Sequence, residues 1–123
     1  MYKYIYIDIY RIDVLVFIGS KEELFKFLKK SKTEKSLDEI RTILNEERTD
    51  GMNTVAQTLN IQGSVLIFSE KPITRKTLVH ECAHATRIIL ENIGAYPSDN
   101  DEPYAYLIEY LYDKAESLCA TSS

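Results

Sequence analysis

Hydrophobic and polar positions alternate at the start of the chain in the pattern of β-strands. Tyrosines and isoleucines take opposite sides from Tyr2 to Tyr10, and a second run rich in β-branched residues covers Ile12–Ile18. A period of two places successive side chains on opposite faces of a sheet. We therefore predict two strands, joined as a hairpin through a turn within Asp8–Asp13.

Helical spacing replaces the alternation after Gly19. Ser20 and Glu23 form a capping-box sequence, and apolar positions then recur with helical spacing to about Lys30. A second capping-box sequence, Ser36 with Glu39, opens a shorter amphipathic pattern. The segment is therefore expected to form two short helices.

The rest of the chain repeats this order with a second pair of strands and a second pair of helices. We expect strands at Met52–Leu59 and Ser64–Ser69, a turn at Asn60–Gly63, and helices from Thr74 to about Ile93 and from Pro103 to about Cys119. Thr74 is typical of a helix N-cap, and Gly94 of the residue that ends a helix. The pattern predicts one α+β domain over residues 1–123, with two β-hairpins, separate or joined in a mixed sheet, beneath the two C-terminal helices.

Composition excludes several classes of protein. The net charge of -4 and pI near 5.2 make nucleic acid an unfavourable partner. The tyrosines of the first strand are therefore interpreted as a sheet face rather than a platform for bases. Two cysteines are too few for a secreted disulfide scaffold, no signal peptide is apparent, and the longest apolar run, Val14–Ile18, cannot span a bilayer. We expect a cytoplasmic protein without membrane contact.

A candidate metal site lies in the third expected helix. The segment from His80 to His84 reads His-Glu-Cys-Ala-His, which matches H-E-x-x-H, and both histidines of the chain belong to it. Side chains four residues apart share one helical face, so both imidazoles can bind one zinc ion. Glu81 lies about 100° around the helix, where it can contact a metal-bound water. Chance placement of two histidines and a glutamate gives this motif with a probability of roughly 0.2%.

The same helix is amphipathic. Opposite the histidines the wheel groups five apolar residues as a core face: Leu78, Cys82, Ala85, Ile89 and Ile93. Free cysteine is among the most buried residue types. Cys82 is therefore assigned to packing and not to the metal.

A catalytic zinc ion needs a third protein ligand. On the final helix Glu102, Tyr106, Glu109 and Asp113 form one stripe that could face the histidines. A tight helical hairpin favours Glu109, while a loop that runs back along the first helix brings Glu102 into reach. Helical geometry leaves both residues open as the third ligand.

The motif and the segment after it resemble zinc metallopeptidases of the gluzincin type, and most of all small predicted peptidases of bacteriophages and bacterial mobile elements. The resemblance covers about Leu78–Leu111, including the segment Glu-Pro-Tyr-Ala-Tyr-Leu that starts at Glu102. It implies a minimal zincin-like fold, Zn²⁺ bound by His80, His84 and Glu102, and Glu81 as the general base.

Two other metallopeptidase groups are less similar. Metzincins extend the motif with a glycine and a third histidine, and this chain has Arg87 and Leu90 at those positions. The metallopeptidases that cleave phage-type repressors also place a glutamate before an alanine-containing helix. The chain lacks their usual continuation into a longer helical region, so this similarity ranks second.

These patterns predict a zinc-dependent peptidase that hydrolyses a protein or peptide substrate. Tyr106 is the first choice, before Tyr110 and Arg87, to donate a hydrogen bond to the developing oxyanion. An extended substrate would pair with a sheet edge, for which Ser64–Ser69 is the candidate. A shallow groove, the Asn45–Gly51 loop or an associated protein would supply selectivity.

Two hypotheses of other classes remain beside the peptidase. The first is a binding protein, of the kind that serves phages or mobile elements as an accessory, which keeps a zinc-stabilised zincin scaffold without turnover. The second is a metal-free accessory protein that acts through its acidic surface. Stoichiometric zinc separates the last hypothesis from the other two.

Overall fold

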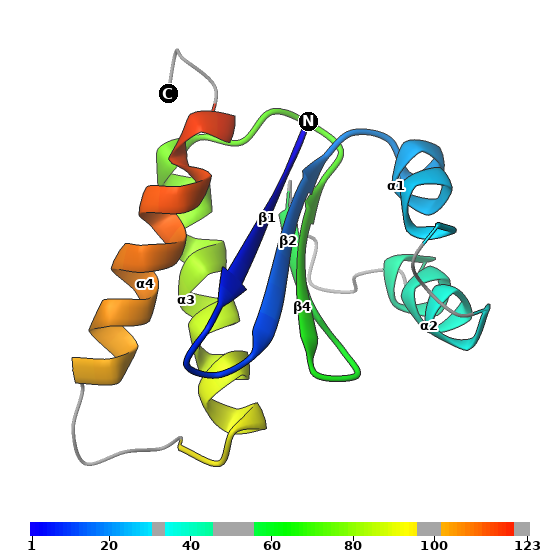
Figure 1. The fold of residues 1–123 in the computed structure, drawn as a ribbon. Coiled ribbons are helices and arrows are strands. Elements are labelled where there is room, and N and C mark those ends of the chain that lie inside the picture. The colour runs from blue at the N-terminus through cyan, green and yellow to red at the C-terminus, as the bar shows by residue number, and fades with distance from the viewer. Residues whose placement is uncertain (31–33, 46–55, 96–101, 120–123) are drawn as a thin grey trace.

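A four-stranded mixed sheet forms the centre of the computed structural model, which describes residues 1–30, 34–45, 56–95 and 102–119 (Figure 1). The strands stand in the order β1-β2-β4-β3. The outer pairs are antiparallel and the central pair β2–β4 is parallel. The strand bounds are β1 (Tyr2–Ile7), β2 (Ile12–Ile18), β3 (Ala56–Ile61) and β4 (Ser64–Ser69). Both predicted hairpins are present, and they are joined in one sheet.

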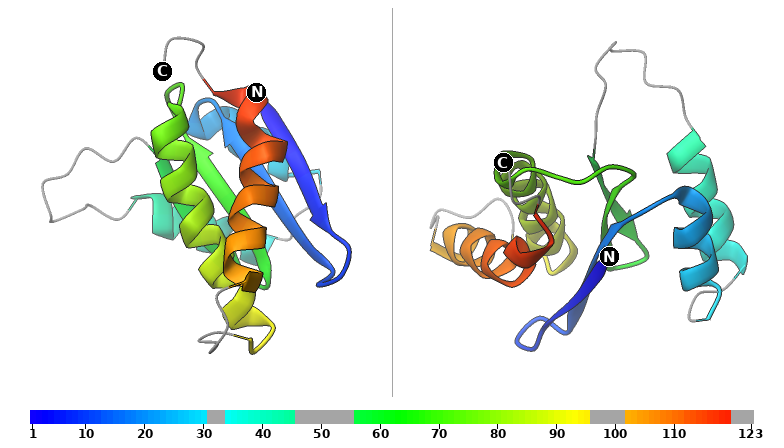
Figure 2. Two further views of the ribbon diagram at one scale, coloured as in Figure 1. Left: turned by 90° about the vertical axis from the view of Figure 1, so that its left-hand side faces the viewer. Right: turned by 90° about the horizontal axis from the view of Figure 1, so that it is seen from above.

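Helices cover both faces of this sheet, so the described residues form three layers (Figure 2). Those on one face are α1 (Lys21–Leu28) and α2 (Glu34–Asn45); those on the other are α3 (Arg75–Asn92), α4 (Glu102–Ala115) and the short 3₁₀ helix η1 (Glu116–Leu118). The α+β class is therefore confirmed, with four α-helices in the described residues. Throughout that part of the chain, no helix is both long and apolar enough to cross a membrane.

The two central strands are buried on both faces. Val14 and Val16 face α3 and α4, while Leu15 and Phe17 face α1 and α2. A strand covered on both sides has no solvent-facing positions to make polar. This explains why β2 and β4 read as continuous apolar runs, whereas β1 alternates between buried isoleucines and exposed tyrosines.

The predicted edge position of Ser64–Ser69 is wrong. This segment is β4, and it lies between β2 and β3. After β2 the chain passes through α1 and α2 to the outer position of β3, and the second hairpin then returns it to the middle of the sheet. The edge strands are β1 and β3.

The core face of α3 largely confirms the helical wheel. Leu78, Cys82, Ala85 and Ile89 are fully buried. Ile93 is 37% exposed, so its assignment to the core is wrong. The helix ends at Asn92, and Ile93 is its C-cap before Gly94, whose φ of 75° turns the chain away. The buried face also includes Glu81, which bonds to Thr58 of β3 on one flank of the helix, and Thr86 and Leu90 on the other flank.

The two capping boxes have different outcomes. Ser20 and Glu23 make both reciprocal hydrogen bonds at the start of α1, as predicted. The box at Ser36 is wrong, because α2 already begins at Glu34. Ser36 lies buried inside the helix, and its hydroxyl donates a hydrogen bond of 3.3 Å to Gln62 Oε1 in the turn between β3 and β4. Ser36 thus bonds to a residue distant in sequence instead of forming the expected capping box with Glu39.

The turn between β3 and β4 is shorter than predicted. The four-residue turn at Asn60–Gly63 is wrong, since β3 continues to Ile61 and only Gln62 and Gly63 form the loop. Both have positive φ, 50° and 92°, which matches the twist of a two-residue hairpin. The expected strand residues 52–55 and residues 46–51 of the expected substrate loop lie outside the described residues.

The end of α3 provides a test of this packing. We expect Ile89→Ala to lower the free energy of unfolding by about 2–5 kcal/mol, because it leaves a cavity in the core. Ile93→Ala on the same helix should cost less than about 1 kcal/mol, since this side chain is partly exposed. Urea unfolding followed by circular dichroism measures both. Equal losses would contradict the described end of the buried face.

Candidate metal centre

Helix α3 carries the motif on a well-capped segment of eighteen residues. The Thr74 hydroxyl accepts a hydrogen bond of 3.2 Å from the Thr77 backbone N–H, which satisfies one of the free donors of the first turn. The opposite face of the helix is buried against the sheet and α4. His80 and His84 are therefore held on the side that faces solvent.

The two histidine side chains converge on one point. Their Nε2 atoms are 3.1 Å apart, and the ring centroids are 4.7 Å apart with the planes at 79°. Two nitrogens that bind one tetrahedral zinc ion at 2.0–2.1 Å stand about 3.3 Å from each other. The pair therefore has nearly the separation that a shared ion requires. The same distance also permits a hydrogen bond between two neutral imidazoles.

Glu81 lies beside the histidines but is buried at the junction of α3 and β3. Only 4% of the residue is exposed. The Thr58 hydroxyl on β3 donates a short hydrogen bond of 2.5 Å to Glu81 Oε2. A hydroxyl bonded to a carboxylate makes a strong, short contact that restricts the side-chain rotamer. The orientation of Glu81 therefore depends on an edge strand 23 residues away in sequence.

A second contact joins the same strand and helix. The side-chain amides of Asn60 on β3 and Asn92 on α3 bond reciprocally, at 3.1 and 3.2 Å. Neither Thr58 nor this amide pair was predicted from the sequence. Alternation along β3 places Thr58 and Asn60 on one face, but nothing local shows that α3 lies over that face.

The structure does not bring Glu102 or Tyr106 to the histidines. Both are exposed and line a hollow of about 550 Å³ between α4 and the β1–β2 turn. The other residues of this hollow are Ile7, Asp8, Ile9, Tyr10, Pro103, Leu107 and Tyr110. The flank of α4 that carries Glu102 and Tyr106 thus faces β1, whereas α3 lies on its other side (Figure 2).

The register between α3 and α4 places Glu109 closer to the histidine level. The helices run antiparallel, and the Arg75 Nε atom pairs with Glu116 Oε1 at 3.2 Å across them. Glu109 lies seven residues before Glu116 and Cys82 lies seven after Arg75, so Glu109 is level with the middle of the motif. By the same count Glu102 is level with Ile89, about 7.5 Å along the axis from His84.

A complete metal site is not formed by the described residues. Among them, no group of three or more histidine, cysteine, aspartate or glutamate side chains could hold an ion. On the outer face of α3, Arg87 Nε lies 3.9 Å from Glu91 Oε1 in an exposed ion pair. The described part of the chain thus brings together two imidazoles and the adjacent Glu81, but no third ligand.

Cys82 is fully buried and belongs to the core cluster, as predicted. Burial, with smaller contributions from Cys119 and Glu81, raises the pKa of its thiol to about 12. Metals bind the thiolate form of cysteine, which is suppressed in this environment. Cys82 is therefore a packing residue within the motif.

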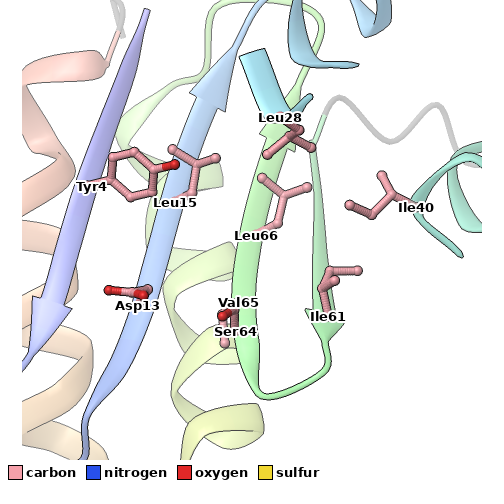
Figure 3. A pocket seen from close by; sticks show the side chains of 9 residues that line it. All are labelled: Tyr4, Asp13, Leu15, Leu28, Ile40, Ile61, Ser64, Val65 and Leu66. Carbon is pink, nitrogen blue, oxygen red and sulfur yellow. The ribbon is translucent and has the colours of Figure 1, made fainter. Parts of the chain in front are cut away.

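A separate hollow lies on the opposite face of the sheet (Figure 3). Its volume is about 320 Å³, and most of its lining is aliphatic: Leu15, Leu28, Ile40, Ile61, Val65 and Leu66, with Tyr4, Asp13 and Ser64. It contains neither histidine. The sheet separates it from the motif, so it has no place in the metal chemistry.

Comparison with known proteins adds no assignment. No protein-family model, curated protein or solved structure matches the chain. The resemblance to gluzincin peptidases therefore depends on the residues of the motif and the segment after it. The geometry of the histidine pair is the feature on which a function can be argued.

The burial of the Cys82 thiol gives a prediction about its reactivity. At pH 8 a pKa of about 12 leaves about one Cys82 in ten thousand as thiolate. In the native protein we expect a chromogenic thiol reagent to modify the half-buried Cys119 first, and Cys82 only as the protein unfolds. Urea should make both reactive. Equal rates in the native state would contradict the assignment of Cys82 to the core.

Proposed function

We propose that the chain is a zinc-dependent metallopeptidase built on a minimal zincin-like fold. The observation that carries this proposal is the 3.1 Å separation of His80 Nε2 and His84 Nε2 on the exposed face of α3. Two imidazoles at this separation, followed by a glutamate within the motif, are the donor set that zinc peptidases use. The competing interpretation is a hydrogen-bonded pair of neutral histidines, with Glu81 as a packing residue bonded to Thr58.

A bound zinc ion and the side chains of the protein would each supply part of the catalysis. A bound zinc ion would polarise the substrate carbonyl and lower the pKa of an attacking water towards about 7. Glu81 accepts the proton of this water on its carboxylate and delivers it to the leaving amine. The Thr58 hydroxyl, bonded to Oε2, holds that carboxylate in place during both transfers.

Two carboxylates compete as the third ligand. The register of the helices favours Glu109, which is level with the motif and exposed. The resemblance favours Glu102, which would require the first turn of α4 to shift by about 7.5 Å along α3. The proposal therefore ranks Glu109 first by its level along α3 and retains Glu102 as the alternative. Both belong to the stripe of α4 that faces away from α3, so either carboxylate would reach the ion only after α4 turns about its axis. Tyr106 receives no role, because it faces β1.

The substrate that suits this arrangement is an extended polypeptide. Strand β3 is an edge of the sheet, and its Thr58 contacts Glu81. A peptide that pairs with β3 would run past the histidines with its main chain held by hydrogen bonds. We place this activity in the cytoplasm, where Cys82 and Cys119 would remain free thiols, as they are in the structure.

Zinc content and turnover test the proposal together. We expect one zinc ion per chain and its loss in His84→Ala, because a single imidazole cannot hold the ion. Glu81→Gln should retain zinc and lose about 100-fold or more of the hydrolysis, since the proton acceptor is removed. Elemental analysis gives the zinc content, and mass spectrometry of peptide products gives turnover.

Glu91→Gln is the matched control, because Glu91 lies exposed on the same helix face and should affect neither quantity. Stoichiometric zinc without any turnover in the unmodified protein would identify the non-catalytic zincin scaffold instead. A protein without stoichiometric zinc would contradict both functions and leave the metal-free accessory protein.

The third ligand has its own test. Glu109→Gln should weaken zinc binding by about 100-fold or more, whereas Glu102→Gln should leave it almost unchanged. Competition with a chromogenic chelator measures both affinities, and circular dichroism checks that both variants fold. The reverse result would assign Glu102. Two unchanged affinities would show that neither glutamate is a ligand.

A further inference from the structure

Strand β1 exposes a regular row of main-chain groups at the edge farthest from α3. The Met1 and Ile18 residues exchange both of their hydrogen bonds, Ile18 N–H to Met1 O at 2.8 Å and the Met1 ammonium to Ile18 O at 2.9 Å. Hydrogen-bonded pairs alternate with non-bonded pairs in an antiparallel ladder. The N–H and C=O groups of Tyr2, Tyr4 and Tyr6 therefore point away from β2, towards the outside of the sheet.

This edge has few of the features that prevent one strand from pairing with another. Strand β1 contains no proline, and its register with β2 runs from Tyr2 to Ile7 without a bulge. Natural proteins block free edges with prolines, bulges or charged side chains, lysine above all. Strand β1 carries one such charge, Lys3, on the face opposite the tyrosines. A strand of six residues with a single charge and a regular backbone is a template for strand addition.

The side chains on this edge are aromatic and half exposed. Tyr2, Tyr4 and Tyr6 are 52%, 50% and 50% exposed, on the sheet face that carries α1. The centroid of the Phe27 ring of α1 lies 4.5 Å from that of the Tyr2 ring and 5.9 Å from that of the Tyr4 ring. Aromatic rings on adjacent strands stabilise the pairing of those strands. The edge thus offers main-chain bonds and apolar area together.

We propose that β1 pairs antiparallel with β1 of a second copy of the chain, with Tyr4 opposite Tyr4. In this register Tyr2 of each copy meets Tyr6 of the other. Every residue with outward main-chain groups between Tyr2 and Tyr6 then has a partner of the same kind. The shifted registers that place Tyr4 opposite Tyr2 or Tyr6 leave a tyrosine of each copy without a tyrosine partner.

A second copy fits this edge in charge as well as in hydrogen bonding. All facing residues on the aromatic side are uncharged tyrosines, and Lys3 falls opposite Ile5 on the other face of the strand. The antiparallel arrangement has the two-fold symmetry that is commonest among homo-oligomers. No like charges meet across the strands despite the net charge of -4 of each chain.

The buried area suits a dimer of low affinity. A tyrosine side chain offers about 150–250 Å², so the half-exposed rings of both copies contribute at most about 450–750 Å². With the backbone edges and the exposed Met1 the total reaches at most about 1,000 Å², below the usual size of a specific interface. The result is one eight-stranded sheet in which both histidine pairs remain open, since α3 packs on β3 and β4.

Sedimentation equilibrium over about 1–500 µM, a range suited to small interfaces, measures the association. We expect a mass approaching twice 14.2 kDa. Tyr4→Pro removes an outward N–H but no hydrogen bond to β2, so it should weaken the dimer about tenfold or more. Asn60→Pro is the control at the opposite edge, because the Asn60 N–H also points outward, and its dimer should persist. This variant also removes the amide pair with Asn92, so circular dichroism must show that it is folded.

Disulfide trapping tests the register without a proline in the strand. In a Cys119→Ser background, Tyr4→Cys should form a covalent dimer on oxidation, since facing Cα atoms stand about 5.5 Å apart. Tyr6→Cys alone should remain a monomer, but a mixture of Tyr2→Cys and Tyr6→Cys chains should cross-link. Cross-linking of Tyr6→Cys alone at the rate of Tyr4→Cys would overturn the register.

A chain that stays monomeric at every concentration would overturn the dimer itself, and the edge would then belong to a different partner. A dimer that Tyr4→Pro leaves unchanged in a folded protein would overturn the role of β1. Neither result depends on zinc. The dimer and the proposed peptidase can therefore fail independently.

Discussion

Burial of helix α3 against two different neighbours is the constraint on which the candidate centre depends. The sheet covers one part of its circumference and α4 covers another, so seven of its residues are buried and His80 and His84 remain on the open side. The two imidazoles cannot turn inward, because the positions opposite them are occupied by Cys82, Ala85 and Ile89. Their convergence to 3.1 Å follows from helical spacing on a helix held in this orientation.

The sequence predicted the features that depend on neighbouring residues alone, namely strand positions and helix starts. Alternation located β1, a run of β-branched residues located β2, and the capping chemistry of Ser20 and Thr74 located the starts of α1 and α3. The errors arise where distant segments meet. Ser36 looks like an N-cap in sequence, but in the structure it bonds to Gln62 in the turn between β3 and β4. Strand β4 looks like an edge by its place in the chain, and only the crossover through α1 and α2 makes it central.

The same distinction between local and distant contacts applies to the candidate metal centre. A spacing of four residues is sufficient to predict that two histidines share a face, and a helical wheel is sufficient to bury Cys82. A helical wheel gives the direction in which a side chain points from the helix axis. It does not show which helix or strand lies on that side. The acidic stripe of α4 was therefore predicted to face the histidines, while Glu102 and Tyr106 face β1. Thr58 was missed for the same reason, since its contact with Glu81 exists only once β3 lies beside α3.

The sheet has two edges with different chemistry, and the difference follows from how the helices cover it. Strand β3 lies against α3 and is tied to it by Thr58 and Asn60, so its edge is coupled to Glu81 and the histidines. Strand β1 has no hydrogen bond of this kind to α3 in the described residues, and its outward face is aromatic. A peptide added at β3 would lie beside Glu81 and the histidines, whereas a strand added at β1 would extend the sheet away from them. Two strand-pairing surfaces can therefore coexist on a sheet of four strands without competing for the same main-chain groups.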